Sequence, residues 1–263
     1  MKIVSWNCEK GLTLNKVKLL LNNEKFNGAD IYAIQECKES DINSEIEEKL
    51  GHSQGSWYGD HKEYEWYRKG DLGIALFSDK FNIERMNTGE ELYRYVIPYK
   101  ITDKESLKSF ILIHIWTKKK NKIGNQNEDY LLAVLNAMKD EKYKKFLFPY
   151  DNEVVWLGDF NCSYQVRDIW SKEKFKEFDT IITKNLYSSY HQSRRLTLGQ
   201  EEEMTYFDRK SNSFFNDYIF VGKNSFEITN SCVGSEKGWS VTDCNKAFSS
   251  DHCPVMAEII IKE

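Results

Sequence analysis

Short apolar runs alternate with segments of helical period near the start of the chain. Residues 2–6 and 30–35 are mainly apolar and predict two buried strands. Between them, apolar side chains recur at helical spacing over residues 14–21 and predict a helix. Ser40 precedes apolar residues spaced by four over 42–50, so we expect a second helix with Ser40 as its N-cap.

The middle of the chain changes pattern. Residues 72–78, 81–86, 92–99 and 109–116 predict four strands without helices between them, as in an antiparallel meander. Helical period returns at residues 131–138. Further strands are expected at 153–157, 204–207, 214–221, 226–232 and 254–261. Elements mixed in this way predict an α/β sandwich, with two packed sheets and helices outside them.

The composition indicates one folded unit. The chain has 263 residues, 40% of them hydrophobic and 14% aromatic, which is enough to bury a sizeable core. Only three prolines occur, and no linker rich in Ser, Gly or Pro divides the sequence. We therefore predict a single domain over residues 1–263.

The charge does not indicate a broad basic surface for gripping nucleic acid, because the net charge is −4 and the pI about 5.9. Local basic clusters remain, although such clusters are usually solvated loops. They comprise Lys118, Lys119, Lys120 and Lys122 in one segment and Arg194, Arg195, Arg209 and Lys210 in a looser second group.

No targeting or membrane signal stands out. The N-terminus resembles a strand rather than a signal peptide, and the longest apolar run, 110–115, is too short to span a bilayer. We expect a cytoplasmic protein without a membrane span. The six cysteines form no C-x-x-C pair, and in a chain this long they are expected to be reduced thiols.

Polar residues stand where apolar strands end, which is where sheets present functional groups. They are Asn7, Glu36, Asp159 with Asn161, and Asp251 with His252. Singly, each is typical of a turn, a helix cap or a polar surface. The sequence also lacks a Gly-rich phosphate loop, an H-E-x-x-H helix and a G-x-S-x-G elbow.

Taken in order, these residues carry a resemblance. The series Trp6-Asn7, Gln35-Glu36, Gly158-Asp159-Phe160-Asn161, Asn216-Asp217-Tyr218-Ile219-Phe220 and Ser250-Asp251-His252 resembles the endonuclease/exonuclease/phosphatase superfamily. The resemblance extends from residue 3 to residue 260, and Asp-Tyr-Ile-Phe is closest to nuclease-like and uncharacterised bacterial members. It implies a deoxyribonuclease I-like fold, a four-layer α/β sandwich of two mixed sheets flanked by helices.

The resemblance also implies a metal-dependent phosphoesterase site. Mg²⁺, or Mn²⁺, prefers oxygen ligands, so Glu36 is expected to bind it together with Asp251 and Asn7. Asp159 would orient or deprotonate the attacking water, and Asn161 would hold that water or a phosphate oxygen. His252 would contact the scissile phosphate while Asp217 holds its far nitrogen.

One position of the family pattern has two candidates in this sequence. Many members carry a His or Tyr that contacts the phosphate at the end of the central strand. His114 and Trp116 lie two residues apart and share one face of the 109–116 strand, so either could fill that position. We favour His114 as a proton donor, whereas Trp116 could only pack or stack.

Four cysteines, Cys8, Cys37, Cys162 and Cys253, directly follow proposed site residues. Neighbours in extended chain point to opposite faces, so we expect these thiols to pack away from the site and predict no zinc.

The substrate is less sharply defined. We expect a nuclease, on the basis of the resemblance and of basic and aromatic loop residues. These residues are Trp57, Tyr58, Trp66, Tyr67, Arg68 and the lysines of 118–122. The alternative is a phosphatase or phosphodiesterase for a small molecule or lipid headgroup, which suits the acidic charge. A catalytically silent phosphate-binding scaffold is disfavoured because the acidic residues and His252 are all present.

Overall fold

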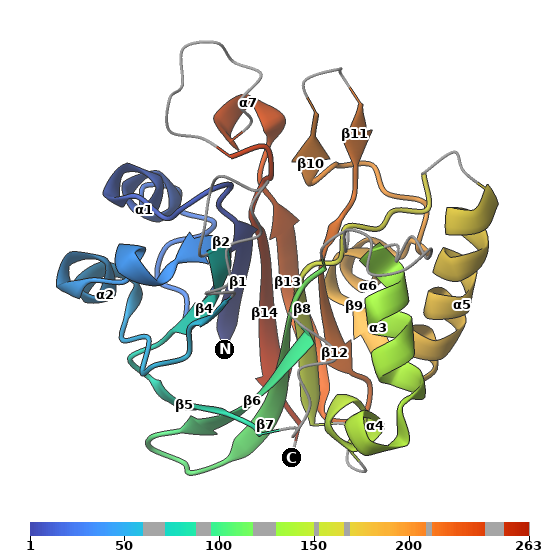
Figure 1. The fold of residues 1–263 in the computed structure, drawn as a ribbon, viewed down its shortest axis with the longest axis horizontal. Coiled ribbons are helices and arrows are strands. Elements are labelled where there is room, and N and C mark those ends of the chain that lie inside the picture. Colours follow the sequence, from blue (N-terminus) through green and yellow to red (C-terminus); the bar gives the residue numbers. More distant parts are fainter. Residues whose placement is uncertain are drawn as a thin grey trace, which may run out of the picture.

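Two six-stranded sheets lie at the centre of the computed structural model (Figure 1). The structure describes residues 1–59, 72–87, 96–117, 130–149, 153–165, 169–208, 212–239 and 250–262. The first sheet has the order β13 (Phe226–Val233), β14 (Val255–Ile261), β1 (Lys2–Asn7), β2 (Ile31–Lys38), β4 (Leu72–Phe77) and β3 (Tyr58–Gly59). The second has the order β5 (Phe81–Arg85), β6 (Val96–Asp103), β7 (Ser109–Trp116), β8 (Val154–Asp159), β12 (Asp217–Gly222) and β9 (Leu186–Ser188).

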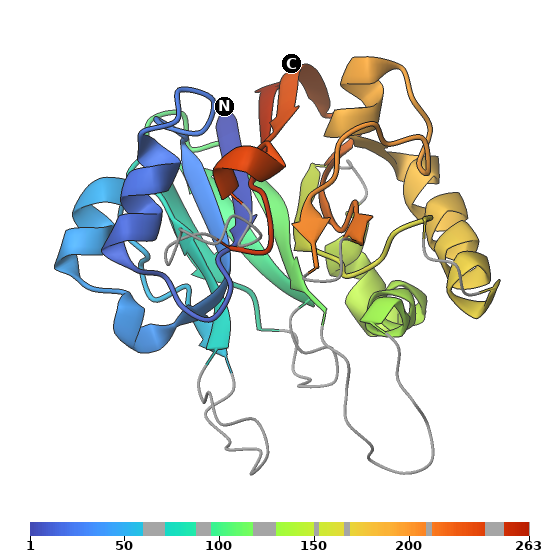
Figure 2. The same cartoon turned by 90° about the horizontal axis from the view of Figure 1, so that it is seen from above.

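Helices cover the outer face of each sheet, as Figures 1 and 2 show. Beside the first sheet lie α1 (Leu14–Leu21), α2 (Ser44–Leu50) and the short α7 (Glu236–Trp239). Beside the second lie α3 (Tyr130–Lys139), α4 (Glu141–Leu147), α5 (Ile169–Asn185) and α6 (Ser189–Arg194). The predicted four-layer α/β sandwich with two mixed sheets is confirmed.

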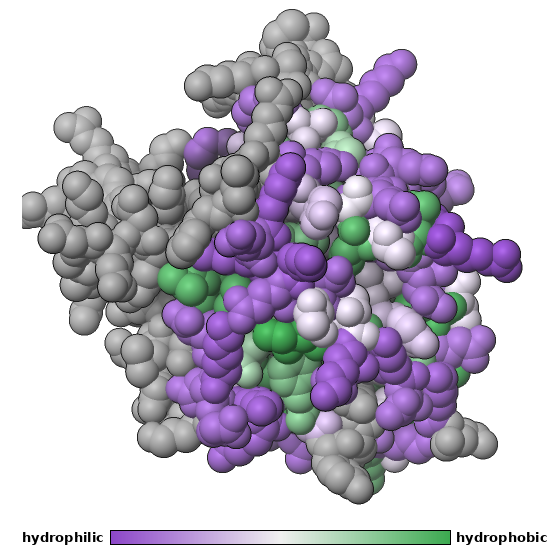
Figure 3. Space-filling view, turned by 90° about the vertical axis from the view of Figure 1, so that its right-hand side faces the viewer, coloured by the Kyte–Doolittle hydropathy of each residue, from purple (hydrophilic) through white to green (hydrophobic). Residues whose placement is uncertain are grey.

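The side of the molecule that carries the second group of helices is mostly hydrophilic, with small hydrophobic patches (Figure 3). The apolar side chains of α5 point inward instead, since Phe175, Phe178 and Ile182 are almost completely buried. Within the described ranges, no helix combines the length and the apolar character needed to cross a membrane.

Strand directions bring five strand ends to one edge of the sandwich. β1 runs parallel to β2, and β7 parallel to β8, whereas β14 and β12 run antiparallel to β1 and β8. The carboxyl ends of β1, β2 and β8 therefore meet the amino ends of β12 and β14, at the edge opposite the two termini (Figure 1). A site built from strand ends has to lie at this edge.

The predicted four-strand run is divided between the sheets. β4 pairs with β2 in the first sheet, and only β5, β6 and β7 form the antiparallel run in the second. The expected strand at 204–207 is reduced to β10 (Tyr206–Phe207), which pairs with β11 (Ser213–Phe214) as a separate hairpin. The segment 214–221 is therefore split between β11 and β12.

Ser40 is not the N-cap of the second helix. Residues 39–41 form a 3₁₀ turn, η1 (Glu39–Asp41), and Asp41 Oδ2 accepts the N–H groups of Leu12 at 2.7 Å and Lys38 at 2.8 Å. The helix begins only at Ser44, where Asn43 Oδ1 caps the N–H groups of the first turn. The residues predicted to start the helix therefore form this turn instead, and the helix begins four residues after Ser40.

Candidate active site

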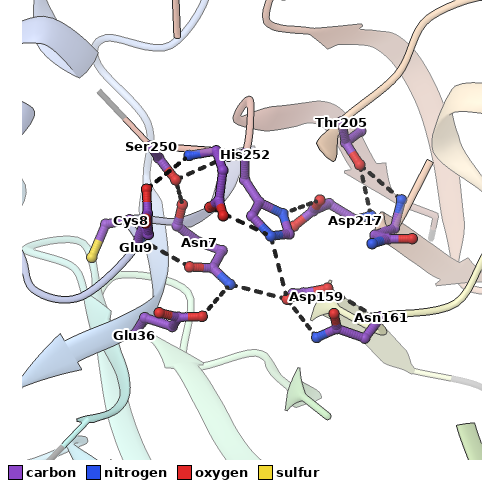
Figure 4. A network of polar contacts seen from close by, with 12 residues as sticks. Asn7, Cys8, Glu9, Glu36, Asp159, Asn161, Thr205, Asp217, Ser250 and His252 are labelled. Carbon is purple, nitrogen blue, oxygen red and sulfur yellow. Dashed lines mark hydrogen bonds and ion pairs between the residues drawn. The ribbon is translucent and has the colours of Figure 1, made fainter. Parts of the chain in front are cut away.

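Asn7, the last residue of β1, lies between the two sheets and joins them. Its Nδ2 donates to Glu36 Oε1 at 3.1 Å in the first sheet and to Asp159 Oδ2 at 3.0 Å in the second (Figure 4). Its Oδ1 accepts the N–H of Glu9 at 3.0 Å. Two carboxylates need donors and one amide needs an acceptor, so the network fixes which way the Asn7 amide faces.

Glu36 reaches this network because of a bulge in β2. The ladder between β2 and β4 shifts register between Gln35 and Cys37, and Glu36 has a φ of +60°. In a regular strand Glu36 would face away from Gln35, which pairs with Asn7, but the bulge turns it toward Asn7. A left-handed conformation at such a residue costs about 1–2 kcal/mol, which is typical of functional positions.

Asp159 is fixed by the chain turn at the end of β8. Gly158 has a φ of +131°, and a Cβ there would lie 1.8 Å from the Ile115 carbonyl oxygen, so only glycine fits. Asp159 Oδ1 accepts the N–H of Asn161 at 2.8 Å, and Oδ2 accepts the Asn161 Nδ2 at 2.7 Å. Asn161, with a φ of +47°, also donates to the Thr117 carbonyl at 2.9 Å.

His252 lies between two carboxylates of the second sheet. Its Nδ1 contacts Asp217 Oδ2 at 2.8 Å, and its Nε2 lies 3.8 Å from Asp159 Oδ2 and 4.0 Å from Asp251 Oδ1 (Figure 4). Ser250 anchors the turn before it, because its hydroxyl donates to the Asn7 carbonyl at 2.7 Å and accepts the His252 N–H at 3.0 Å.

Thr205 ties the strands that carry His252 and Asp217. Its hydroxyl accepts the N–H groups of Asn216 at 2.8 Å and Asp217 at 3.0 Å, and its carbonyl accepts the N–H of Cys253 at 2.7 Å. Thr205 is fully buried, so loss of its hydroxyl would leave the two buried N–H groups without an acceptor. Thr205 is not one of the residues predicted from the sequence, because it stands at no predicted strand end.

The site has unequal charge on its two sides. Burial alone would lower the pKa of His252, but Asp217 and Asp159 raise it to about 10, so the ring is an imidazolium. Burial raises the pKa of Asp159, with Asp217 adding to the effect and His252 opposing it. Burial also raises the pKa of Asp251 to about 6, and the carboxylates of Glu9 and Glu36 contribute to that rise.

Solved structures with this arrangement of elements match the whole chain, whereas no protein-family model and no curated relative matches the sequence. An endonuclease/exonuclease/phosphatase family protein from Leptotrichia buccalis is 18% identical, with a TM-score of 0.57 and 99% of each chain covered. The human Nocturnin catalytic domain is 19% identical, with a TM-score of 0.61, over 100% of this chain and 93% of that one. An AP endonuclease from Leishmania major is 13% identical, with a TM-score of 0.60, over 100% and 88%.

The chain has the same fold as these solved structures, one of which is an endonuclease/exonuclease/phosphatase family protein. At these identities the likeness establishes the architecture alone. The superfamily resemblance inferred from the sequence motifs is nevertheless confirmed at the level of the fold.

The donor atoms of the site fit a divalent cation on the side of Glu36. Glu36 and Asp251 offer carboxylate oxygens, and the Glu9 and Glu36 carboxylates lie near enough to Asp251 to add to the rise in its pKa that burial causes. Asn7 contributes differently from the expectation, because its Oδ1 is turned to the Glu9 N–H and its Nδ2 faces the carboxylates. In this arrangement Asn7 bridges the sheets as a donor and does not present an oxygen to an ion.

The group formed by Asp159, Asp217 and His252 is less suited to a metal ion than the Glu36 side of the site. One ligand atom each of Asp159, Asp217 and His252 lie within 4.8 Å of one another. A metal-bound imidazole must be unprotonated at the ligating nitrogen, but the two carboxylates favour the protonated ring of His252. This trio therefore holds a proton, and the ion fits the opposite side of the site.

His114 does not join the cluster of polar residues at the strand ends. It is fully buried, its Nε2 contacts Gln35 Nε2 at 2.7 Å, and burial lowers its pKa to about 3. The register explains this, because His114 pairs with Leu157 whereas Trp116 pairs with Asp159, two residue pairs closer to the strand ends. Trp116, 4% exposed, is therefore the residue of this strand that adjoins the cluster.

The cysteines that follow site residues are buried packing groups. Cys8, Cys37, Cys162 and Cys253 are at most 7% exposed, and Figure 4 shows the Cys8 sulfur directed away from the cluster. Burial raises the pKa of Cys8 to about 12, which keeps that thiol protonated.

Aromatic side chains that the sequence analysis did not single out lie next to His252. The Tyr206 ring is 4.8 Å from the His252 ring, and Tyr206 stacks with Phe214 across the β10–β11 hairpin at 6.3 Å. Both aromatic residues are half-buried. The signal that could have found them is the Met-Thr-Tyr-Phe segment ahead of the Asp217 strand, which sequence reasoning took for an ordinary strand.

Two of the aromatic residues expected to contact nucleic acid, Trp57 and Tyr58, lie in the described ranges and contact other parts of the chain. Trp57 is 9% exposed and its Nε1 donates to the Cys37 carbonyl at 3.3 Å, while Tyr58 lies under Arg85. Arg194 packs over Tyr190 and pairs with Glu203. Trp66, Tyr67, Arg68, Lys118, Lys119, Lys120, Lys122, Arg209 and Lys210 lie outside the described residues.

Proposed function

We propose that the chain is a divalent-metal-dependent phosphoesterase that hydrolyses phosphodiester bonds of nucleic acid. The observation that supports the activity is the pairing of opposite charges in one site. The His252 imidazolium lies 4.0 Å from Asp251 Oδ1 and 3.8 Å from Asp159 Oδ2, and the Asn7 amide joins Asp159 to the Glu36 carboxylate. Such a site can hold the negatively charged phosphate of a phosphoester against the imidazolium and a metal cation against the carboxylates.

In the proposed mechanism, His252 contacts a non-bridging oxygen of the scissile phosphate and neutralises its charge. Asp217, which accepts from Nδ1, keeps the ring protonated and points Nε2 at the substrate. Asp159 takes a proton from the attacking water, and its raised pKa suits a base that works near neutral pH. Asn161 holds Asp159 in place through two hydrogen bonds and can orient the same water.

Glu36 and Asp251 would hold Mg²⁺, with Mn²⁺ as a substitute. The chemistry that the ion supplies when bound is charge neutralisation on the phosphate and on the leaving oxygen. Asn7 keeps Glu36 and Asp159 in fixed relation by donating to both. We assign no proton-transfer role to His114, since its ring contacts Gln35 in the interior.

Two observations support nucleic acid as the substrate class. The Tyr206–Phe214 pair beside His252 offers aromatic faces on which a base or sugar can stack. One of the structurally similar proteins is an AP endonuclease, and the similar Nocturnin structure holds a sulfate anion. A small phosphoester remains the alternative substrate class.

The test is a substrate panel with Mg²⁺ and with Mn²⁺. It comprises single- and double-stranded DNA, a duplex with an abasic site, RNA, inositol phosphates and sphingomyelin. We expect cleavage of at least one nucleic acid and its loss in EDTA. The nuclease proposal is wrong if all nucleic acids stay intact while a small phosphoester is hydrolysed, and no turnover of any substrate would support the silent scaffold.

Two variants test the metal assignment in the same assay. Glu36→Gln should abolish the activity, because the amide keeps the size but removes the charge of the proposed ligand. Glu45→Gln, at an exposed position of α2, is the matched control and should match the wild type. Full activity in Glu36→Gln would rule out Glu36 as the metal ligand.

A further inference from the structure

The loop that follows β1 is folded around one buried lysine. Lys16, in the first turn of α1, is 8% exposed. Its Nζ donates to the carbonyl oxygens of Cys8, of Glu9 at 2.7 Å and of Gly11 at 3.0 Å. Three carbonyl dipoles that converge on one point repel one another unless a cation lies between them, and here the cation is the Lys16 ammonium.

The backbone of this loop is left-handed over consecutive residues. Glu9, Lys10 and Gly11 have φ values of +45°, +60° and +121°. Only glycine adopts such values readily, so the other two residues need the surrounding contacts to hold them. The contacts that the structure shows on the carbonyl side are those of Lys16.

The amide side of the same loop faces the candidate active site. The Glu9 N–H donates to Asn7 Oδ1 at 3.0 Å, and the Lys10 N–H donates to Glu36 Oε2 at 3.1 Å. The loop therefore directs carbonyls toward Lys16 and amides toward Asn7, which joins the two sheets, and Glu36. Backbone N–H groups arranged in this way form a concave anion-binding surface, which here receives the Glu36 carboxylate.

We propose that Lys16 is a positioning residue for metal binding, which fixes the two loop amides and through them the orientation of Glu36 and Asn7. The proposal rests on the proposed function, since it takes Glu36 as a ligand of the ion. Lys16 touches neither substrate nor ion and acts only through the loop.

Electrostatics and positioning predict opposite effects for the loss of Lys16. A positive charge close to a cation site opposes cation binding, so its removal should tighten the binding of Mg²⁺ if charge alone mattered. Loss of a group that orients a ligand typically weakens metal affinity about 10- to 100-fold. We therefore expect Lys16→Met to bind Mg²⁺ about 10- to 100-fold more weakly, although it removes a positive charge.

The experiment measures Mg²⁺ binding by calorimetry with no substrate present, in the wild type, Lys16→Met and Lys18→Met. Lys18 is exposed on the same helix, and Lys18→Met removes the same charge as Lys16→Met. Lys18→Met is therefore the matched control and should bind Mg²⁺ like the wild type. Amide NMR of Glu9 and Lys10 gives a second readout that needs no metal. In Lys16→Met we expect both amides to lose their hydrogen-bonded shifts and to exchange faster.

Each outcome decides the proposal. Equal or tighter Mg²⁺ binding by Lys16→Met, or unchanged loop amides, would overturn it. If the wild type binds no divalent ion, the proposed metal site fails and the amide readout alone decides the role of Lys16. If Lys16→Met does not fold, Lys16→Arg keeps the charge but cannot place one nitrogen against three carbonyls, and it should still disturb both amides. Wild-type amides in that variant would contradict the proposal.

Discussion

Two buried histidines of this molecule have opposite chemistry. His252 is 3% exposed and His114 is fully buried, so both rings are removed from water. Asp217 and Asp159 surround His252 and raise its pKa to about 10, against the effect of burial. Only burial acts on His114, which lies against Gln35, and its pKa falls to about 3. Burial is shared, so the neighbours decide whether a ring is a cation or a neutral group.

The strand register accounts for those neighbours. His114 lies two residues before the end of β7, in the sandwich interior, where apolar strands supply no counter-charge. His252 lies just before β14, at the edge where β8 ends and β12 begins with their aspartates. In this fold a titratable group becomes useful at the strand ends and inert two residues inside.

The largest expected effect concerns activity. His252→Asn should lower kcat about 10²- to 10⁴-fold on a cleavable phosphodiester, because it removes the positive charge against the phosphate. His114→Gln, which keeps an acceptor for the Gln35 amide, should change kcat by less than about threefold. Steady-state kinetics in saturating Mg²⁺ measure both. An equal loss in a folded His114→Gln variant would erase the distinction drawn between the two rings.

A smaller effect, about 2 kcal/mol, concerns stability and pH. The folded pKa of His114 is about 3 and the unfolded value 6.5, so between these the unfolded chain binds one more proton. Its contribution to the free energy of unfolding thus falls below pH 6.5 by about 1.4 kcal/mol per pH unit. The free energy of unfolding of His114→Gln, taken relative to that of the wild type, should therefore rise by about 2 kcal/mol from pH 7 to pH 5.

His252 should show the opposite dependence. Its folded pKa, about 10, lies above the unfolded 6.5, so its stabilisation is fully present below pH 6.5 and is lost as the pH rises through 10. The stability difference between the wild type and His252→Asn should therefore shrink from pH 7 to pH 9. Urea unfolding at pH 5, 7 and 9 covers both histidines. Parallel pH profiles of the two variants would contradict the contrast.

The smallest effect is expected at an exposed histidine. His52 Nδ1 lies 2.7 Å from Asp79 Oδ1, as close as His252 to Asp217, but the two side chains are 71% and 69% exposed. Water screens such a pair, so His52→Gln should cost less than about 1 kcal/mol and leave activity unchanged. A large loss of activity in this variant would contradict the contrast, because it would show that a histidine close to a carboxylate matters for activity even when both are exposed.

Much of the fold is readable from the apolar pattern. The strands of the two sheets are long apolar runs, and their approximate positions follow from the sequence. Helix α5 was missed although Phe175, Phe178 and Ile182 recur at helical spacing, because charged residues between them hide the period. The split of β4 from β5 could not be predicted, since sheet membership depends on which strand β2 accepts as a neighbour.

The sequence predicts which residues form the site but not how their side chains are oriented. Strand-end position indicated Asn7, Glu36, Asp159, Asp251 and His252, and the structure brings these residues together. Their orientation depends on contacts over long sequence separations. The bulge that turns Glu36 inward and the register that separates His114 from Trp116 leave no local pattern, because a period of two fits both residues.

The pairing of β1 with β14 has a consequence for biosynthesis. The Trp6 indole donates to the His252 carbonyl at 3.0 Å, and β1 lies between β2 and β14, so β1 is flanked on one side by a strand from far along the sequence. On the ribosome, β1 emerges well before its partner exists, and pairing over such a separation is slow. A nascent chain that stops before residue 252 lacks His252, so the contact between His252 and Asp217 forms only after β1, β2, β8 and β12 have all been synthesised.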